Sequence, residues 1–288
     1  FTEKTILITG ASDGIGKETA IGLIKKNPKR LILACRESDK ARQAKETIAS
    51  LSSVTQVQLE WIDLADLASV QMCASRLIKQ DILIDVLVNN AGVLTSQKYQ
   101  TKDGFEMQFG TNYLGHFLLT ELLLSHQRIQ SDARIIQLSS HAMLFGHLDF
   151  DDLQCQHRRY SGWRAYTQSK LANVVYANHL QRIHPNLTTY SVHPGMVRTQ
   201  FARHSGLFHL LDRLFYPIFY CLSNSPAEGA STSIYLASND DPATRQGGLY
   251  WMNCKPFTMF KNKESQDVSV QEKLYIYSQE AVKDYTLF

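Results

Sequence analysis

Short apolar segments alternate with longer segments of helical spacing along most of the chain. The apolar segments have the length of buried strands and lie at residues 4–9, 31–35, 56–61, 84–89, 134–138 and 188–193. The segments with apolar residues at helical intervals lie at residues 14–26, 39–51, 67–78, 105–125 and 163–183. Strands that alternate with helices form right-handed crossovers, which give a parallel sheet with helices on both faces. The sequence therefore predicts an α/β fold built on a single doubly wound, mostly parallel Rossmann-like sheet.

The composition is that of an ordinary globular protein. Of the 288 residues, 44% are hydrophobic and 20% are charged, so the chain can bury a large core. No Pro/Gly/Ser-rich linker, charge block or repeat divides it, and we expect one domain over residues 1–288. The net charge of +3 is small and the basic residues are scattered among acids, which argues against nucleic acid as a partner.

The cysteines and the apolar runs bear on the cellular compartment. The five cysteines are an odd number without a CxxC pair, so a disulfide framework and a zinc site are not indicated and a reducing compartment fits best. No apolar run reaches the length of about 18 residues that a membrane-spanning helix needs. The chain begins at Phe1, almost directly on a strand. We expect a cytoplasmic protein, or one peripheral to an intracellular membrane if a preceding segment acts as an anchor.

A glycine-rich turn follows the first predicted strand and precedes the first predicted helix. Its order, G-x-x-x-G-x-G, would let the backbone approach a pyrophosphate, whose charge is met by free N–H groups and by the positive end of the helix. A tight connection without a ligand is the plainer interpretation, but the position between strand and helix favours a dinucleotide site. The residues that we expect at the cofactor are Gly10, Ser12, Asp13, Gly14, Ile15 and Gly16.

Arg36 follows the second predicted strand, where the adenosine ribose lies in folds of this kind. An acid at this point would bind the 2′-hydroxyl of NAD, and none is present. A guanidinium matches the 2′-phosphate of NADP through charge-assisted hydrogen bonds. A solvated arginine at a strand end is the alternative, and the nearby Asp13 opposes a phosphate. NADP(H) is the predicted cofactor.

Two further strand ends carry residues suited to the same ligand. Asp63 and Leu64 follow the third strand, where the carboxylate could accept from the adenine amine while the leucine packs on the ring; Asp63 could equally be a helix N-cap. Asn89 ends the fourth strand and is followed by Asn90, Ala91 and Gly92. The small residues among them could leave room for a cofactor at this edge of the sheet. The two adjacent amides could also simply form a turn.

Tyr166 and Lys170 lie four residues apart in a predicted helix, so the phenol and the ammonium share one face. A phenol has an ordinary pKa of about 10, and a cation one turn away would lower it and suit tyrosine to general acid/base chemistry on an alcohol or carbonyl. Alone, the two residues could be a plain surface pair. However, Ser139 and Ser140 end the fifth strand at the same sheet edge, where a hydroxyl could donate to a substrate oxygen.

Taken in order, these motifs resemble those of the short-chain dehydrogenase/reductase family, and the resemblance extends from residue 5 to about residue 250. Within the family, the chain is most similar to the branch of the retinol dehydrogenases and the WW-domain oxidoreductases. The segments that carry this closer resemblance are GIGKETA at 14–20, ACR at 34–36, NYLGHF at 112–117 and SVHPG at 191–195.

The resemblance implies a role for each matching residue. Tyr166 would be the general acid/base, Lys170 would tune it and bind the nicotinamide ribose, and Ser140 would polarise the substrate carbonyl, with Ser139 as the alternative. Asn112, on the long predicted helix, would hold a water that links Lys170 to solvent. The stretch at 194–199 resembles the segment that contacts the nicotinamide carboxamide, through Pro194, Gly195, Val197 and Thr199. A homodimer through the helices at 105–125 and 163–183 is also an expectation from the resemblance.

Two departures from the family pattern stand out. About a dozen extra residues separate Ser140 from Tyr166 when the chain is compared with the shorter family members, and we interpret them as a loop beside the substrate. This loop contains aspartates and histidines, but their spacing does not indicate a metal site, and no metal is predicted. The second departure is Asp13, where relatives that use NADP often carry a neutral or basic residue, and it bears on the cofactor preference.

The most apolar part of the chain lies at residues 206–222, where Leu207, Leu210, Leu214 and Ile218 follow helical spacing. A core helix is one interpretation. In relatives, however, this region is a lid over the substrate, and we expect such a lid at about residues 197–224. An apolar lid would bury a lipophilic substrate or rest on a membrane surface.

The sequence thus predicts an NADP(H)-dependent oxidoreductase that interconverts a carbonyl and an alcohol on a lipophilic substrate such as a retinoid, steroid or aldehyde. A catalytically idle NADP-binding sensor or scaffold is the alternative, since a fold does not fix a function. Isomerase or dehydratase chemistry on the same scaffold is a third hypothesis.

Overall fold

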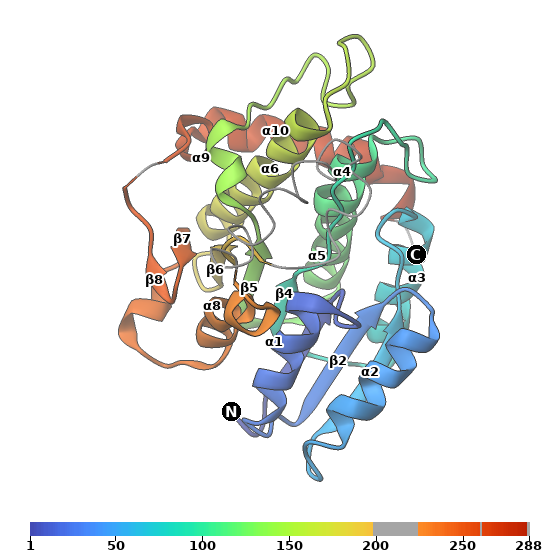
Figure 1. The fold of residues 1–288 in the computed structure, drawn as a ribbon, viewed down its shortest axis with the longest axis vertical. Helices are drawn as coiled ribbons and strands as arrows, with labels where there is room; N and C mark the ends of the chain where they lie inside the picture. The colour runs from blue at the N-terminus through green and yellow to red at the C-terminus, as the bar shows by residue number, and fades with distance from the viewer. Residues whose placement is uncertain (198–223, 260, 287–288) are drawn as a thin grey trace, which may run out of the picture.

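The core of the protein is one eight-stranded sheet (Figure 1), seen in a computed structural model that describes residues 1–197, 224–259 and 261–286. The strands lie in the order β3-β2-β1-β4-β5-β6-β7-β8, and all neighbours are parallel except β7 and β8. Their bounds are β1 Thr5–Thr9, β2 Arg30–Cys35, β3 Gln56–Trp61, β4 Ile84–Asn89, β5 Ile129–Leu138, β6 Thr188–His193, β7 Leu249–Met252 and β8 Lys255–Pro256. The predicted doubly wound, mostly parallel sheet is confirmed.

Helices cover both faces of this sheet (Figure 1). Within residues 1–197, 224–259 and 261–286, the α-helices are α1 Gly14–Ile24, α2 Asp39–Ala49, α3 Leu67–Lys79, α4 Met107–Phe109, α5 Gly115–Ser125, α6 Gly162–Ile183, α8 Pro226–Ser238, α9 Lys263–Gln266 and α10 Val268–Val282. Successive strand residues point to opposite faces. Leu7 of β1 packs in the core formed with α3, α5 and α6, whereas Ile6 and Ile8 pack in the core formed with α1, α2 and α8.

The strand order reverses beside β1, which pairs with β2 on one side and with β4 on the other. Ligands of open α/β sheets bind outside the carboxyl ends of the strands at such a point. Thr9, Asn89 and Leu138 end β1, β4 and β5 there. The sheet thus brings the ends of segments far apart in sequence to one edge.

The helix predicted at 105–125 differs from the structure. It begins with the short α4, continues as a π-helical turn at Gly110–Leu114, and only then becomes the regular α5. All five residues of the π turn are buried. The spacing of the apolar residues along 105–125 therefore does not distinguish this turn from an α-helix. A π turn is a rare element that often marks functional sites, and this one carries Asn112.

The C-terminal elements were not predicted. α8 begins at a capping box in which Ser225 and Glu228 satisfy each other's backbone N–H groups. α10 packs along α6 and α5, and the phenol of its Tyr275 hydrogen-bonds Glu121 of α5 at 3.0 Å. The chain's own α10 therefore covers part of the helix pair through which two copies were expected to associate.

The expected lid lies almost wholly outside the described residues, as do Thr199 and the apolar residues at 206–222. At its borders, Val197 and Asn224 form a parallel bridge, and the backbone N–H of Asn224 donates to the Met196 carbonyl at 2.6 Å. The segment therefore leaves and re-enters the described fold at one place, next to Pro194 and Gly195. No helix among the described residues is long and apolar enough to cross a membrane.

Candidate active site

The glycine-rich turn packs against the loop that follows β4. Gly10 has a φ of +68°, and a Cβ atom there would lie 2.9 Å from the Ala91 Cβ. At Gly16, a Cβ would lie 2.4 Å from both the Asn90 Nδ2 and the Gly10 carbonyl oxygen. These positions admit only glycine without movement of the backbone. The backbone at the start of α1 is thereby left uncovered by side chains, as the approach of a pyrophosphate requires.

Thr9 holds this turn to the end of β4. Its hydroxyl accepts from the backbone N–H groups of Asn90 and Ala91 at 2.9 and 3.1 Å, and its carbonyl accepts from the Asn90 amide at 2.8 Å. Asn90 is thus fixed as part of the floor beneath the turn. Gly92 lies deeper, where a Cβ would meet the Asn112 Oδ1 at 3.2 Å and the Lys170 Nζ at 3.5 Å. The predicted Asn-Asn-Ala-Gly motif therefore joins the glycine-rich turn to the residues of the acid/base group.

Asp13 is the N-cap residue of α1, but its carboxylate does not accept the hydrogen bond that a capping residue usually takes from the second or third residue of the helix. It forms an ion pair with Lys40, near the start of α2. Burial is the largest single influence on Asp13 and opposes its ionisation, but the hydrogen bonds from Lys40 and from the Gly14 N–H, together with the charges of Lys40 and Lys17, outweigh burial and lower the carboxyl pKa. Beyond Gly14, the N–H groups at the start of α1 are not capped by Asp13, as the approach of a pyrophosphate requires.

Lys40 was not among the residues predicted at the cofactor. The signal in the sequence was a second basic residue close behind Arg36, at the start of the second predicted helix. Arg36 itself is exposed just past β2, and no carboxylate pairs with it in the part of the chain that the structure describes. Two cations thus stand near the glycine-rich turn, one of them held by Asp13.

Asp63 does not serve as the N-cap that was its alternative role. The N-cap of α3 is Asp66, whose side chain accepts from the Ser69 N–H. Asp63 accepts from the Ala65 backbone at 2.9 Å and lies with the buried Leu64 just past the end of β3. Its predicted contact with adenine stays a prediction.

Tyr166 and Ser140 meet at the carboxyl edge of the sheet. Ser140 hydrogen-bonds the Tyr166 phenol and so tends to lower its pKa. The Ser140 Oγ also accepts from the Ala142 N–H at 3.2 Å, which fixes the side chain. By contrast, the Ser139 hydroxyl is buried and donates to the Lys170 carbonyl at 2.7 Å. Of the two serines, Ser140 is the one that contacts the phenol.

Lys170 lies beneath Tyr166, with its Nζ 5.7 Å from the ring centroid. The ammonium donates to the Leu138 carbonyl at 3.1 Å, and burial lowers its pKa to about 8. Burial also raises the pKa of Tyr166 to about 12, against the effect of Ser140. Burial therefore outweighs the hydrogen bond from Ser140, and the lowering of the phenol pKa by Lys170 stays a prediction. At neutral pH Tyr166 is a protonated phenol, able to donate.

Asn112 connects the site to the loop after β4. Its Oδ1 accepts from the Val93 N–H at 2.7 Å, while its Nδ2 donates to the Val93 carbonyl and the Ser169 hydroxyl, both at 3.0 Å. The amide is thus occupied by protein groups. Its backbone carbonyl accepts from the His116 imidazole at 3.0 Å. The geometry explains why Asn112 is fixed beside Lys170, and the water it was expected to hold stays a prediction.

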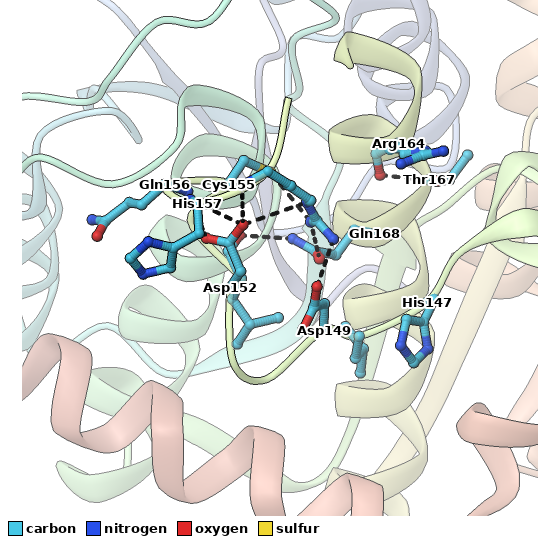
Figure 2. Close-up of polar contacts among 12 residues, drawn as sticks. His147, Asp149, Asp152, Cys155, Gln156, His157, Arg164, Thr167 and Gln168 are labelled. Carbon is cyan, nitrogen blue, oxygen red and sulfur yellow. Dashed lines mark hydrogen bonds and ion pairs between the residues drawn. The ribbon is translucent and has the colours of Figure 1, made fainter. Parts of the chain in front are cut away.

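The extra residues between Ser140 and Tyr166 form a loop that is docked on α6 (Figure 2). The Asp152 carboxylate accepts from the backbone of Gln156 at 2.5 Å and of His157 at 3.2 Å. Arg158 then donates to Gln168 at 3.0 Å, between Tyr166 and Lys170 on the helix. Figure 2 shows the His157 imidazole on the side of the loop away from α6. The loop thus contacts the helix that carries the acid/base pair.

The same arrangement of fold and motifs occurs in known proteins. The family model described as short chain dehydrogenase matches residues 4–207. Retinol dehydrogenase 13 of Homo sapiens is 40% identical over 280 residues, covering 94% of this chain and 82% of the relative. Retinol dehydrogenase 12 of Mus musculus is 39% identical, covering 94% of this chain and 84% of that protein.

Solved structures agree on the fold. An uncharacterised protein of Mycobacterium paratuberculosis superimposes with a TM-score of 0.77 and 32% identity, covering 98% of this chain and 94% of that one. A short-chain dehydrogenase of Shigella flexneri, solved with NADP, has a TM-score of 0.67 at 24% identity, covering 88% and 98% of the two chains. With the match of the family model, these similarities show that the chain belongs to the short-chain dehydrogenase/reductase family, among relatives of the retinol dehydrogenases.

Proposed function

We propose that the protein is an NADP(H)-dependent oxidoreductase that interconverts a carbonyl and an alcohol on a lipophilic substrate. The observation that carries the proposal is the protonated phenol of Tyr166, hydrogen-bonded to Ser140 and placed over Lys170 at the carboxyl edge of the sheet. A bound nicotinamide would supply or accept the hydride. Tyr166 would donate its Oη proton to the substrate oxygen during reduction, and Ser140 would hold that oxygen. In oxidation, Tyr166 would take the proton back.

The cofactor proposal rests on the two cations near the glycine-rich turn. A 2′-phosphate would be attracted by Arg36 and would compete with the Asp13 carboxylate for Lys40. Asp13 thus weakens the preference for NADPH without reversing it, since both members of its ion pair are about half exposed. The fold neighbour from Shigella flexneri, which was solved with NADP, is consistent with this proposal.

Asp13→Asn is expected to strengthen the preference for NADPH over NADH by about threefold, because an exposed ion pair contributes up to about 1 kcal/mol. The neutral amide cannot hold Lys40, which is then available to the 2′-phosphate. Titration of both dinucleotides by fluorescence would give the ratio of the two Kd values. Asp39→Asn is a matched control, since Asp39 is exposed and pairs with Arg42 instead. A ratio that moves toward NADH would contradict a competing role for Asp13.

The substrate proposal rests on the relatives and on the surface beside Tyr166. The relatives named above are retinol dehydrogenases, which points to a lipophilic alcohol or aldehyde. Trp163, one turn before Tyr166 on α6, is 55% exposed, and the centroids of the two rings are 6.3 Å apart. An exposed tryptophan beside the phenol is suited to contact a hydrocarbon.

A series of straight aldehydes with four to ten carbons tests both the activity and the substrate class. We expect the protein to consume NADPH and kcat/KM to rise at least about fourfold from the four-carbon to the ten-carbon aldehyde. Burial of a single methylene contributes about 0.8 kcal/mol, which corresponds to a rise of about fourfold. The measurement is the decline of NADPH absorbance at saturating cofactor. A preference for the shortest aldehydes would contradict a lipophilic pocket. Binding of NADPH without turnover of any carbonyl would instead favour the idle sensor or the isomerase.

A further inference from the structure

Four rings form a cluster next to Ser140, and this aromatic cluster consists of His141, His193, Tyr250 and Phe257. The His141 ring stacks on His193 with centroids 4.0 Å apart and contacts Phe257 at 4.7 Å. The sheet explains the gathering: β5 leads into His141, β6 ends at His193, and β7 carries Tyr250, so three neighbouring strands bring three of the rings together. Phe257 directly follows β8, and its backbone N–H donates to the Tyr250 carbonyl at 2.8 Å. The proposed acid/base chemistry uses none of the four.

The polar atoms of the cluster are only partly occupied. The backbone N–H of His141 donates to the His193 Nδ1 at 3.3 Å, and the His141 Nδ1 lies 3.2 Å from the Tyr250 Oη. Burial, aided by His141, lowers the pKa of His193 to about 3, so that ring is neutral near pH 7. The cluster therefore has a neutral inner ring and an outer polar pair, His141 and Tyr250.

Either tautomer of His141 leaves this pair with a hydrogen to donate. If the Tyr250 hydroxyl donates to Nδ1, the histidine carries its proton on Nε2; if Nδ1 donates instead, the Tyr250 hydroxyl is released. Among the described residues, the His141 imidazole and the Tyr250 hydroxyl have no hydrogen-bond partner other than each other. Both residues are partly exposed, so part of the pair lies at the surface of the described fold.

The pair also lies close to the reacting atoms. His141 directly follows Ser140, which hydrogen-bonds the Tyr166 phenol. Burial raises the pKa of Tyr250, and charge on Tyr166 raises it further, which places the two phenols within electrostatic range. A carbonyl held between Ser140 and Tyr166 would thus have His141 and Tyr250 as nearby polar neighbours.

We propose that His141 and Tyr250 form a polar subsite that binds a second oxygen of the substrate, beside the position of the reacting carbonyl. The subsite would favour carbonyl compounds with an additional hydroxyl, keto or ether oxygen, while the ring faces of the aromatic cluster contact flat or conjugated carbon. This inference rests on the proposed oxidoreductase function and adds a substrate class to it.

The test compares aldehydes of similar size that differ in one polar group. The probes are 3-hydroxybenzaldehyde with 3-methylbenzaldehyde, and the corresponding 4-substituted pair, reduced with NADPH. For each pair, the quantity of interest is the hydroxy-to-methyl ratio of kcat/KM. His141→Phe is expected to lower this ratio by about threefold to tenfold in at least one pair, the range that a net hydrogen bond supplies. A general loss of structure would lower both members of a pair equally and leave the ratio unchanged.

Three further variants complete the design. Tyr250→Phe should lower the ratio as His141→Phe does, and it decides the question if His141→Phe does not fold. His141→Gln keeps an N–H donor and should retain most of the ratio. His147→Phe is the matched control, because His147 is exposed on the following loop and should leave the ratio at its wild-type value.

The outcomes separate this inference from the function on which it rests. If the wild type reduces the methyl compounds and the ratio changes by less than twofold in both His141→Phe and Tyr250→Phe, the subsite is overturned and the oxidoreductase proposal stands. If the wild type consumes no NADPH with any of the four aldehydes or with the straight-chain series, the proposed function itself fails, and the subsite fails with it.

Discussion

Tyr166→Phe is expected to lower kcat by at least about 10²-fold, because it removes the one oxygen that passes a proton to or from the substrate. The change deletes a single atom from a ring that is otherwise kept, so the packing around it is little disturbed. The Kd of NADPH should stay within about twofold of the wild-type value, since the glycine-rich turn and Arg36 are untouched. Steady-state turnover of the best aldehyde and fluorescence titration of NADPH are the two measurements.

The structure supplies a reason to expect so large an effect. Burial raises the pKa of Tyr166 to about 12, so the phenol is a proton donor whose ionised form depends on its neighbours. Ser140 could hold the substrate oxygen in the variant but could not replace the proton path. Tyr99→Phe is a suitable control, because Tyr99 is exposed and its phenol donates to the side chain of Gln97, two residues earlier in the chain. Retention of more than a tenth of the activity by Tyr166→Phe would exclude Tyr166 as the acid/base residue.

Much of the fold was predictable because its sheet is buried on both faces. The strands at β1, β2 and β4 are nearly continuous apolar runs, which periodicity finds easily. The π turn that carries Asn112 was not predictable, because its residues are buried on all sides and its apolar pattern does not differ from that of an α-helix. α10 was missed because its buried residues, among them Leu274 and Ser278, alternate with exposed polar ones and form only a weak apolar stripe.

The candidate site was predictable as far as it depends on strand ends. Parallel strands bring their carboxyl ends to one edge, so the residues after β1, β4 and β5 could be assigned to one place without coordinates. Contacts between side chains could not be predicted in this way. Asp13 meets Lys40, and His141 meets Tyr250 across 109 positions, although nothing in the local sequence of either pair requires it. The depth of burial that sets the pKa of Tyr166 is likewise a property of the packed structure.

Arg36 is the residue on which the proposed cofactor preference mainly depends. It is exposed at the end of β2 and unpaired with any carboxylate of the described chain, so a phosphate would not have to displace an existing ion pair there. Charge-assisted hydrogen bonds of a guanidinium to a phosphate contribute about 1.5–3 kcal/mol. Lys40 must first be released by Asp13, so its contribution should be smaller.

Arg36→Leu is therefore expected to weaken NADPH binding by about tenfold to a hundredfold, the range that corresponds to about 1.5–3 kcal/mol, while NADH binding changes by less than about twofold. The loss should shrink at high ionic strength, because salt screens the exposed charge in the wild type. Arg30→Leu is the matched control: Arg30 lies at the opposite end of the same strand, bonded to Gln56, and its replacement should affect neither dinucleotide. Kd values for both cofactors, measured at low and high salt, check the prediction. Equal losses for NADPH and NADH would show that Arg36 supports the strand end and does not recognise the 2′-phosphate.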